Sequence, residues 1–409
     1  MRRLWWAVAV TSVGDGASAA AVPLLAVTVT RDPRLVSFVT AAAYLPWLLL
    51  SLPAGALVDR HERVGLLWRA RAVQAAVAGA LAALALTGHA GVAVLAVAVF
   101  CLGACAVVAD NAAQALLPAL VPEALLHKAN GHQNAAVTVG RQFVGPPVGG
   151  FLSAIAVGLP FVVDACSFAV SAALVAGLPR RPLPPAQRAS GLRWLLRHRL
   201  LRLLALLLGV NTFCFQLGMV ALVLVAARTP HLGTRGYGLL LAAAACGGVL
   251  GGLGNAWLIA RIGRLPALVG ALALGAPAFG GIAFGPPAWV LGGLLAVAGF
   301  ATTGWNVVTV SLRQQLVPPG MLGRVNAVYR MVGWGLMPLG AVAGGLVAHR
   351  FGVCAPFGVA GAVRGVALVV VLPFLVAAAR EGLTPSGSAE RIVHRGWSAA
   401  PARGANNDR

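Results

Sequence analysis

The chain has 409 residues, of which 59% are hydrophobic and only 10% are charged, and its mean hydropathy is +0.86. A soluble domain carries about 25% charged residues, so this composition indicates a protein embedded in a bilayer. The net charge of +21 does not indicate a nucleic-acid partner, because the basic residues lie in short segments between apolar runs.

Enzymatic chemistry is not expected from this sequence. The eight histidines are scattered singly, and the six cysteines lie in or beside apolar stretches without the spacing of metal ligands. The sequence shows neither a Ser/His/Asp order nor a phosphate-binding loop. We therefore expect a protein that is not an enzyme and uses no cofactor, metal or ATP.

Apolar runs recur along the chain, and a helix needs about 20 apolar residues to cross a bilayer. The sequence predicts an all-α polytopic membrane protein with twelve transmembrane helices in two six-helix bundles. The expected domains are an N-terminal bundle (1–179), a cytoplasmic linker loop (180–199), a C-terminal bundle (200–380) and a disordered cytoplasmic tail (381–409). The predicted spans are 5–28, 35–58, 68–87, 90–112, 134–156, 160–178, 201–226, 236–259, 265–284, 287–309, 325–348 and 354–379.

The basic residues indicate the orientation of the chain. If the N-terminus is cytoplasmic, 24 of the 31 Lys and Arg fall in cytoplasmic segments, five fall in outer loops, and Arg141 and Arg364 lie inside spans. Cytoplasmic loops of membrane proteins carry an excess of Lys and Arg. We therefore predict a multi-pass protein of the plasma (inner) membrane with both termini in the cytoplasm.

The two halves of the chain contain a repeat. Residues 120–150 align without a gap on residues 316–346, and each copy is a polar loop that runs into a Gly-rich apolar helix. Parallel repetition of two halves is one of the architectures of secondary transporters. The repeat therefore favours a transporter.

The loop after the second span carries Gly55, Asp59, Arg60 and Arg63. A charge cluster at a helix end can act as a conformational latch, paired in one state and separated in another. The loop resembles the G-x-L-x-D-R-x-G-R pattern of the major facilitator superfamily. Glu62 stands where that family usually has Gly.

The fifth span contains Gly145, Pro146, Gly149 and Gly150. Small residues permit close helix packing, and Pro permits a bend. The stretch resembles the G-P-x-x-G-G motif of drug/proton antiporters within the superfamily, and plain small-residue packing is the alternative. The loops "LVP…AN" (120–130) and "LVP…GRVN" (316–326) are similar to those of macrolide-efflux and enterobactin-type siderophore exporters.

Ionisable groups inside a membrane are functional candidates. Asp15, Asp110 and Asp164 lie in or at the edges of spans, and the repeat places Asp15 on Asn211 and Asp110 on Asn306. We therefore expect any proton relay in the first half. Asp15 is the first candidate for proton coupling or recognition of a cationic substrate, with a structural acid as the alternative. Asp110 is expected to pair with a base, and Asp164 to cap or anchor its helix.

Two arginines lie inside predicted spans. Arg141 is expected to pair with Asp110 or Asp59, and Arg364 has no evident partner. The superfamily resemblance implies a central cavity lined by the first, fourth, seventh and tenth spans. Its candidate residues besides Asp15 are Asn211, Phe213, Gln216, Trp305 and Asn306.

The resemblance implies proton-coupled efflux of an amphipathic small molecule (a drug, a macrolide-like compound or a siderophore) by alternating access. The expected partners are the small-molecule substrate, protons and the lipid bilayer, and a monomer is expected. An uptake symporter of the same fold and a non-transporting membrane receptor are the alternatives.

Overall fold

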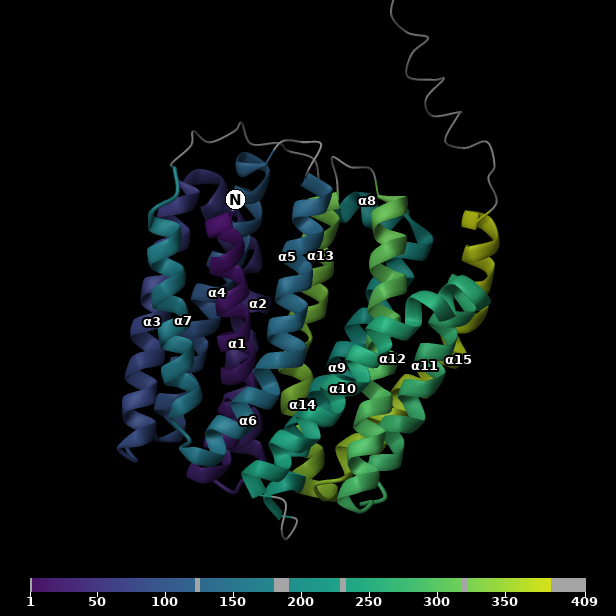
Figure 1. The fold of residues 1–409 in the computed structure, drawn as a ribbon. Coiled ribbons are helices and arrows are strands. Elements are labelled where there is room, and N and C mark those ends of the chain that lie inside the picture. Colours follow the sequence, from purple (N-terminus) through teal and green to yellow (C-terminus); the bar gives the residue numbers. More distant parts are fainter. Residues whose placement is uncertain (1, 122–125, 180–190, 229–232, 318–321, 384–409) are drawn as a thin grey trace, which may run out of the picture.

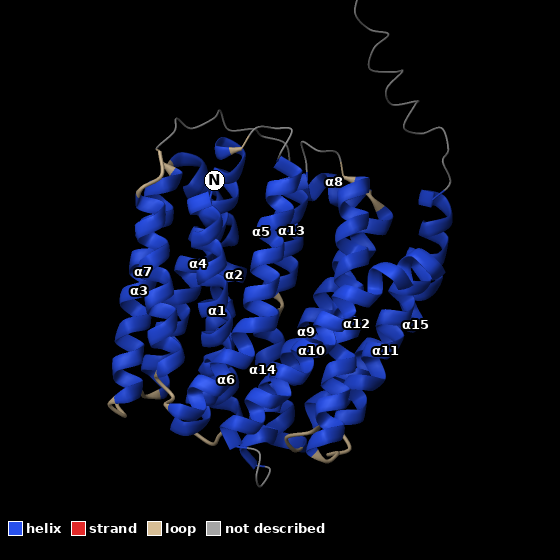
Figure 2. Ribbon diagram, in the orientation of Figure 1, coloured by secondary structure: helices blue, strands red, loops and turns tan. Residues whose placement is uncertain are grey.

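The computed structural model describes residues 2–121, 126–179, 191–228, 233–317 and 322–383, and these are almost entirely helical, with no strand among them (Figure 2). The first half contains α1 (Arg2–Val29), α2 (Pro33–Arg60), α3 (Arg63–Leu86), α4 (Val92–Leu120), α5 (Leu126–Thr138), the π-helix η2 (Val139–Val144), α6 (Gly145–Ile155) and α7 (Leu159–Ala176). The second half contains α8 (Gly191–Arg197), α9 (Arg199–Arg228), α10 (Gly233–Ile262), α11 (Arg264–Ile282), α12 (Ala288–Leu316), α13 (Leu322–Gly335), α14 (Met337–Phe351) and α15 (Ala355–Leu383).

The helices form two side-by-side groups, as the sequence predicts (Figure 1). Helices α1–α7 pack mainly with one another, and so do α9–α15. Helix α1 begins and α15 ends at the same end of the molecule, which we call the terminal face. The other end is the opposite face. The expected linker loop lies outside the described residues from 180 to 190, and the expected tail does so from 384 onwards.

Eleven helices in the described part of the chain are long and apolar enough to cross a membrane. The predicted span 134–156 is not among them, because it is divided into α5, η2 and α6. Pro146 and Pro147 lack the N–H groups that an α-helix needs, and the Gly145 N–H bonds to the Gly140 carbonyl in the wider π register. All twelve predicted spans still fall mainly on helices, the fifth on α5, η2 and α6 and the eleventh on α13 and α14.

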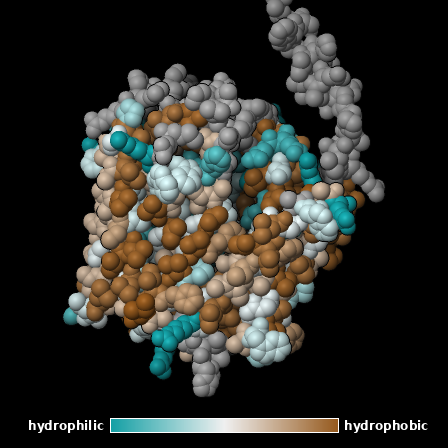
Figure 3. Space-filling view, in the orientation of Figure 1, coloured by the Kyte–Doolittle hydropathy of each residue, from teal (hydrophilic) through white to brown (hydrophobic). Residues whose placement is uncertain are grey.

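Apolar side chains cover much of the face that Figure 3 shows. Leu253, Trp257 and Val369 on α10 and α15 are 76%, 60% and 72% exposed. In water such a surface would promote aggregation, whereas lipid solvates it. The exposed apolar belt therefore agrees with a multi-pass membrane protein.

The buried core differs between the two faces. Near the terminal face, one core around Leu4, Val58 and Leu117 belongs to the first group, and a separate core around Leu201 and Val308 belongs to the second. Near the opposite face, a single core includes residues of both groups. The two groups are therefore joined by apolar packing at the opposite face and have separate cores at the terminal face.

Two equivalent helix pairs make the junction at the opposite face. Helix α6 packs on α10, where a Cβ on Gly150 would lie 2.5 Å from the Cα of Gly238. Helix α14 packs on α2, where a Cβ on Gly345 would overlap the side chain of Ser37. Both contacts are made by a glycine of the repeated stretches 120–150 and 316–346, so small residues close both sides of the junction.

Candidate functional site

An arginine bridges two carboxylates inside the first group of helices. Arg141 donates from Nε to Asp15 Oδ2 at 2.9 Å and from Nη1 to Asp110 Oδ2 at 3.1 Å. The three side chains are only 15–20% exposed and come from η2, α1 and α4. Asp110 is one of the two partners expected from the sequence, and Asp15 takes the place of Asp59, whose side chain lies outside the described residues.

The π-helix positions Arg141 against α1. The Cβ of an alanine at Gly16 would lie 2.9 Å from the carbonyl oxygens of Gly140 and Arg141, so the two backbones approach closely. On the same side, a Cβ on Gly145 would lie 2.6 Å from the Cα of Gly16. A π-helix inserts an extra residue per turn and frequently occurs at functional sites. Here it sets Arg141 beside Asp15.

A second arginine extends the network. Arg71 on α3 lies 3.6 Å from Asp110 Oδ1 and donates to Gln74 Oε1 at 2.9 Å. Gln74 in turn donates to the carbonyl oxygen of Leu102 on α4 at 3.2 Å. Arg71 and Arg141 thus pair with the two carboxylates, and Arg330 of α13 lies close enough to interact electrostatically with Asp110 and Arg141.

The burial of Arg71 corrects the sequence interpretation, which placed it in a cytoplasmic segment. Arg71 is only 2% exposed, and its guanidinium lies 5.4 Å from the ring centroid of Phe168 on α7. A signal was present in the sequence. Arg71 and Gln74 are three residues apart in an apolar helix and therefore share one face.

Asp164 is buried rather than at a helix edge. It is 2% exposed on α7 and accepts a 2.6 Å hydrogen bond from Ser18 Oγ on α1. Among the described residues no base lies within ion-pair distance of it. A Cβ on Gly14 would lie 2.5 Å from Asp164 Oδ1, so residues 14–16 of α1 pack between Asp164 and the Arg141 backbone.

The loop between α2 and α3 is built around Glu62. Glu62 is the N-cap of α3 and accepts hydrogen bonds from the N–H groups of Val64 at 2.8 Å and Gly65 at 2.6 Å. Arg63 donates to the Ala115 carbonyl on α4 at 2.9 Å. Glu62, which stands where the superfamily pattern usually has Gly, therefore caps the N-terminus of α3. Gly55 and Arg60 lie on the last turns of α2, and Arg60 is exposed.

The Gly-rich motif of the fifth span serves helix packing at three positions. Gly145 packs on Gly16 and Gly149 on Ala17, both of α1, whereas Gly150 packs on Gly238 of the other group. Pro146 lies in the first turn of α6, where its missing N–H costs little.

The five cavity candidates of the second half are not gathered in one place. Asn211 and Trp305 line one small pocket together with Arg364. Gln216 is 4% exposed, and Phe213 and Asn306 are half-buried and are not among the residues that line this pocket. Residues 211, 213 and 216 are spread around α9 by the helical period, so a common cavity for the five candidates stays a prediction.

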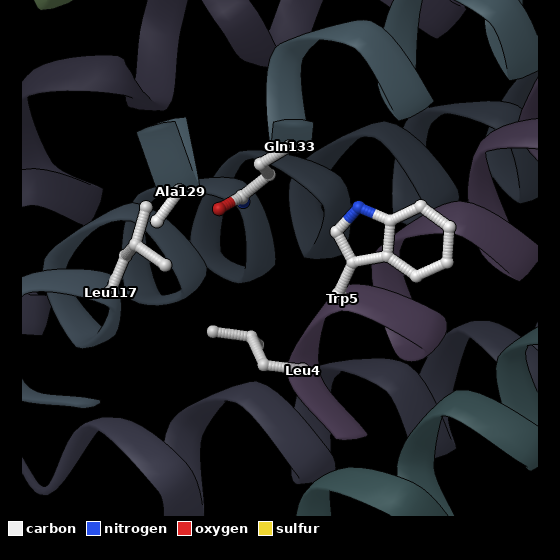
Figure 4. Close-up of a pocket in the computed structure, with 5 residues that line it drawn as sticks. All are labelled: Leu4, Trp5, Leu117, Ala129 and Gln133. Carbon is white, nitrogen blue, oxygen red and sulfur yellow. The ribbon is translucent and has the colours of Figure 1, made fainter. Parts of the chain in front are cut away.

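A second small pocket lies near the terminal face, between α1, α4 and α5. In Figure 4 the amide of Gln133 reaches toward the space that Leu4, Trp5 and Leu117 surround. The lining is mainly apolar, with one amide and the indole N–H as polar groups. The sequence interpretation did not single out this pocket.

Comparison with known proteins identifies the family. Multidrug efflux pump Tap of Mycobacterium tuberculosis (strain ATCC 25618 / H37Rv) is 29% identical over 412 residues, which cover 95% of this chain and 96% of Tap. Two solved structures have the same fold. One is a bacterial homologue of the iron transporter ferroportin in an inward-facing state, with a TM-score of 0.70 and 18% identity; the match covers 91% of this chain and 98% of that one. The other is the nucleoside transporter NupG, with a TM-score of 0.65 and 13% identity; the match covers 92% of this chain and 99% of that one. The profile of the transmembrane secretion effector family matches residues 1–393, and the chain belongs to this family of major facilitator transporters.

Proposed function

We propose that this protein exports amphipathic small molecules across the plasma membrane by alternating access, driven by proton entry. The Arg141 bridge carries the proposal, because it joins two carboxylates from different helices to one cation inside the membrane. The family match over most of the chain and the similarity to a relative named as a multidrug efflux pump support efflux.

The proposed orientation assigns the structure to one state of the transport cycle. With both termini in the cytoplasm, the opposite face is external. The shared core and the two glycine contacts then close the external side, while the separate cores leave the cytoplasmic side able to part. This is the conformation in which an exporter takes up its cargo from the cytoplasm or the inner leaflet.

Proton coupling is assigned to Asp15. Protonation of Asp15 removes one of the two carboxylates that share Arg141 and leaves the cation with Asp110 alone. Breaking a buried ion pair costs about 3–5 kcal/mol. Moving a two-state equilibrium from 1:99 to 99:1 requires about 5.5 kcal/mol, so one protonation supplies most of the energy for a change of conformation.

The loop between α2 and α3 is assigned a separate role. We propose that Gly55, Asp59, Arg60 and Arg63 form a latch at the cytoplasmic side. The Arg63 contact with the α4 backbone supports a link between this loop and the helix that carries Asp110. An Asp59→Asn variant is expected to insert normally but to cycle slowly.

The test is uptake of ethidium and a panel of antibiotics into inverted membrane vesicles, with and without an acid-inside pH gradient. Wild-type vesicles should accumulate cargo, and accumulation should collapse when the gradient is dissipated. Asp15→Asn should lose gradient-driven accumulation but keep downhill flux. Glu390→Gln, which removes an acid beyond α15, is the matched control and should behave as wild type.

The alternatives give different outcomes in the same assay. An uptake symporter would move cargo out of inverted vesicles together with protons. A non-transporting receptor would give no cargo flux in either direction. Equal loss of driven and downhill flux in Asp15→Asn would assign Asp15 to substrate binding and would contradict its role in coupling.

A further inference from the structure

The second group of helices contains buried bases and, before Glu381 in the last turn of α15, no acid. Between Asp164 and Glu381 the sequence has neither an Asp nor a Glu, although this stretch includes Arg364 near the middle of α15. In the first group, by contrast, two arginines balance Asp15 and Asp110. No carboxylate between residues 165 and 380 can therefore neutralise Arg364, and the ionisable group beside it within its own bundle is the Cys214 thiol of α9, a weak acid.

The side chain of Arg364 is buried and incompletely bonded. It is only 9% exposed, and its guanidinium lies 3.9 Å from the ring centroid of Phe279 on α11. One Nη donates to the carbonyl oxygen of Asn211 at 3.2 Å. The Nε atom is buried without a hydrogen-bond partner in the described structure. An unpaired charge is costly in a low-dielectric interior, so the site favours an anion.

The guanidinium borders a pocket that has room and further polar groups. The pocket lies between α9, α11, α12 and α15 and is lined by Asn211, Thr302 and Trp305 besides Arg364. Its remaining lining is small or aliphatic and includes Gly275, where a Cβ would make only an ordinary 3.8 Å contact with Ala301. An amide, a hydroxyl and an indole beside an arginine are hydrogen-bond donors, which an anion requires.

We propose that Arg364, Asn211 and Thr302 form a binding site for a small monovalent anion inside the second bundle. The anion is either a free ion such as chloride or a carboxylate carried by a larger organic molecule. In both cases it bonds to the free Nε of Arg364 and to the side chains of Asn211 and Thr302. Because α9 and α12 belong to this site, bound anion would hold these two helices to α15.

The experiment measures thermal unfolding of the purified full-length protein in detergent at constant ionic strength. Sodium gluconate serves as the reference salt, because the five hydroxyl groups of its anion would lose their hydration in a pocket whose remaining lining is small or aliphatic. Sodium chloride and sodium benzoate are then titrated separately. A ligand that binds only the folded protein raises the unfolding temperature, and a rise on the order of 2 °C is expected for at least one of them.

Variants separate the site from a general salt effect. Arg364→Gln should abolish the rise, and Asn211→Ala and Thr302→Val, which keep the arginine, should weaken the response to the anion at least fivefold in midpoint concentration. Arg313→Gln is the matched control. Arg313 is another arginine of this bundle whose Nε is buried without a hydrogen-bond partner, and its guanidinium lies over the ring of Tyr329. It does not line the pocket. This control should keep the full rise.

Each outcome decides the proposal. Stabilisation by chloride identifies a free-ion site, and stabilisation by benzoate alone identifies a site for an organic carboxylate. No stabilisation by either salt would overturn the proposal, and so would equal stabilisation of the Arg364→Gln and Arg313→Gln variants. Since no transport is measured, the result is independent of the proposed efflux.

Discussion

The balance of charges around Arg141 leads to a prediction about paired substitutions. The network holds two carboxylates and two guanidiniums. Arg141→Gln leaves Asp15 without an ion-pair partner, and Asp15→Asn removes the carboxylate that Arg141 bonds through two nitrogens. The double variant leaves Asp110 with Arg71, 3.6 Å away, so neither remaining ion-paired group lacks a partner. It should therefore be more stable than the Arg141→Gln variant.

The magnitude follows from the cost of an unpaired buried charge. Removing one partner of a buried pair costs about 3–5 kcal/mol, so Arg141→Gln should lower the unfolding temperature by several degrees. Residues in one network show interaction energies of about 0.5–3 kcal/mol. We expect the interaction between Asp15 and Arg141 near the upper end, because Arg141 bonds to Asp15 through two nitrogens.

The assay is thermal unfolding of the two single variants and the double variant in the same detergent, analysed as a double-mutant cycle. Arg34→Gln combined with Asp15→Asn is the control pair, since Arg34 lies in the first turn of α2 and contacts Asp32. The charge-balance reasoning would be refuted if the stability losses of Asp15→Asn and Arg141→Gln simply added in the double variant, as those of the control pair should.

Three further predictions concern other parts of the chain. Gly150→Leu should prevent the contact of α6 with α10 and open the opposite face, which labelling of an introduced cysteine there would detect; unchanged labelling would contradict the junction. The Arg34 guanidinium holds the pKa of Asp32 below its ordinary value of 3.8, and His349, 4.0 Å away, has a weaker influence in the same direction. The ion pair of Asp32 with Arg34 therefore stabilises the folded protein above pH 3.8, and this stabilisation is lost as the pH falls through the lowered pKa. Thermal unfolding between pH 6 and about pH 3 should show this loss for wild type and not for Asp32→Asn, and identical pH profiles would be evidence against it. Glu62→Ala should destabilise the protein by about 1 kcal/mol, because α3 loses its N-cap, and Glu62→Gln should destabilise it by less. Thermal unfolding measures both effects, and an unchanged stability of the alanine variant would show that the cap is dispensable.

The fold could be predicted from sequence because its determinants are local. A bilayer requires long apolar helices, and the repeat and the basic loops set their number and arrangement. The interruption at η2 was less accessible. Two adjacent prolines predict a break or bend, but the π register depends on the fit of Gly140 and Gly145 against α1.

The candidate site was predictable only in part. The acids Asp15, Asp110 and Asp164 were found because charges are rare in the spans, and the shared partner Arg141 was found for the same reason. Arg71 was missed because a base near a span end is normally a loop residue, whereas here the neighbouring Asp110 offsets the cost of its burial. The grouping of cavity residues stays a prediction, because it depends on which face of each helix turns inward.

The unequal charges of the two halves suggest a division of labour between them. The first half can change its charge state without other molecules, because Asp15 and Asp110 compete for Arg141 inside one bundle. The second half has no acid between residues 165 and 380, so a proton arriving there finds no carboxylate to neutralise. Its buried Arg364 responds instead to the arrival of an anion. Since the repeat gives both halves the same helix arrangement, this difference arises from a few substitutions such as Asp15 against Asn211. A proton relay in one bundle and ligand recognition in the other is therefore the arrangement that the charges favour.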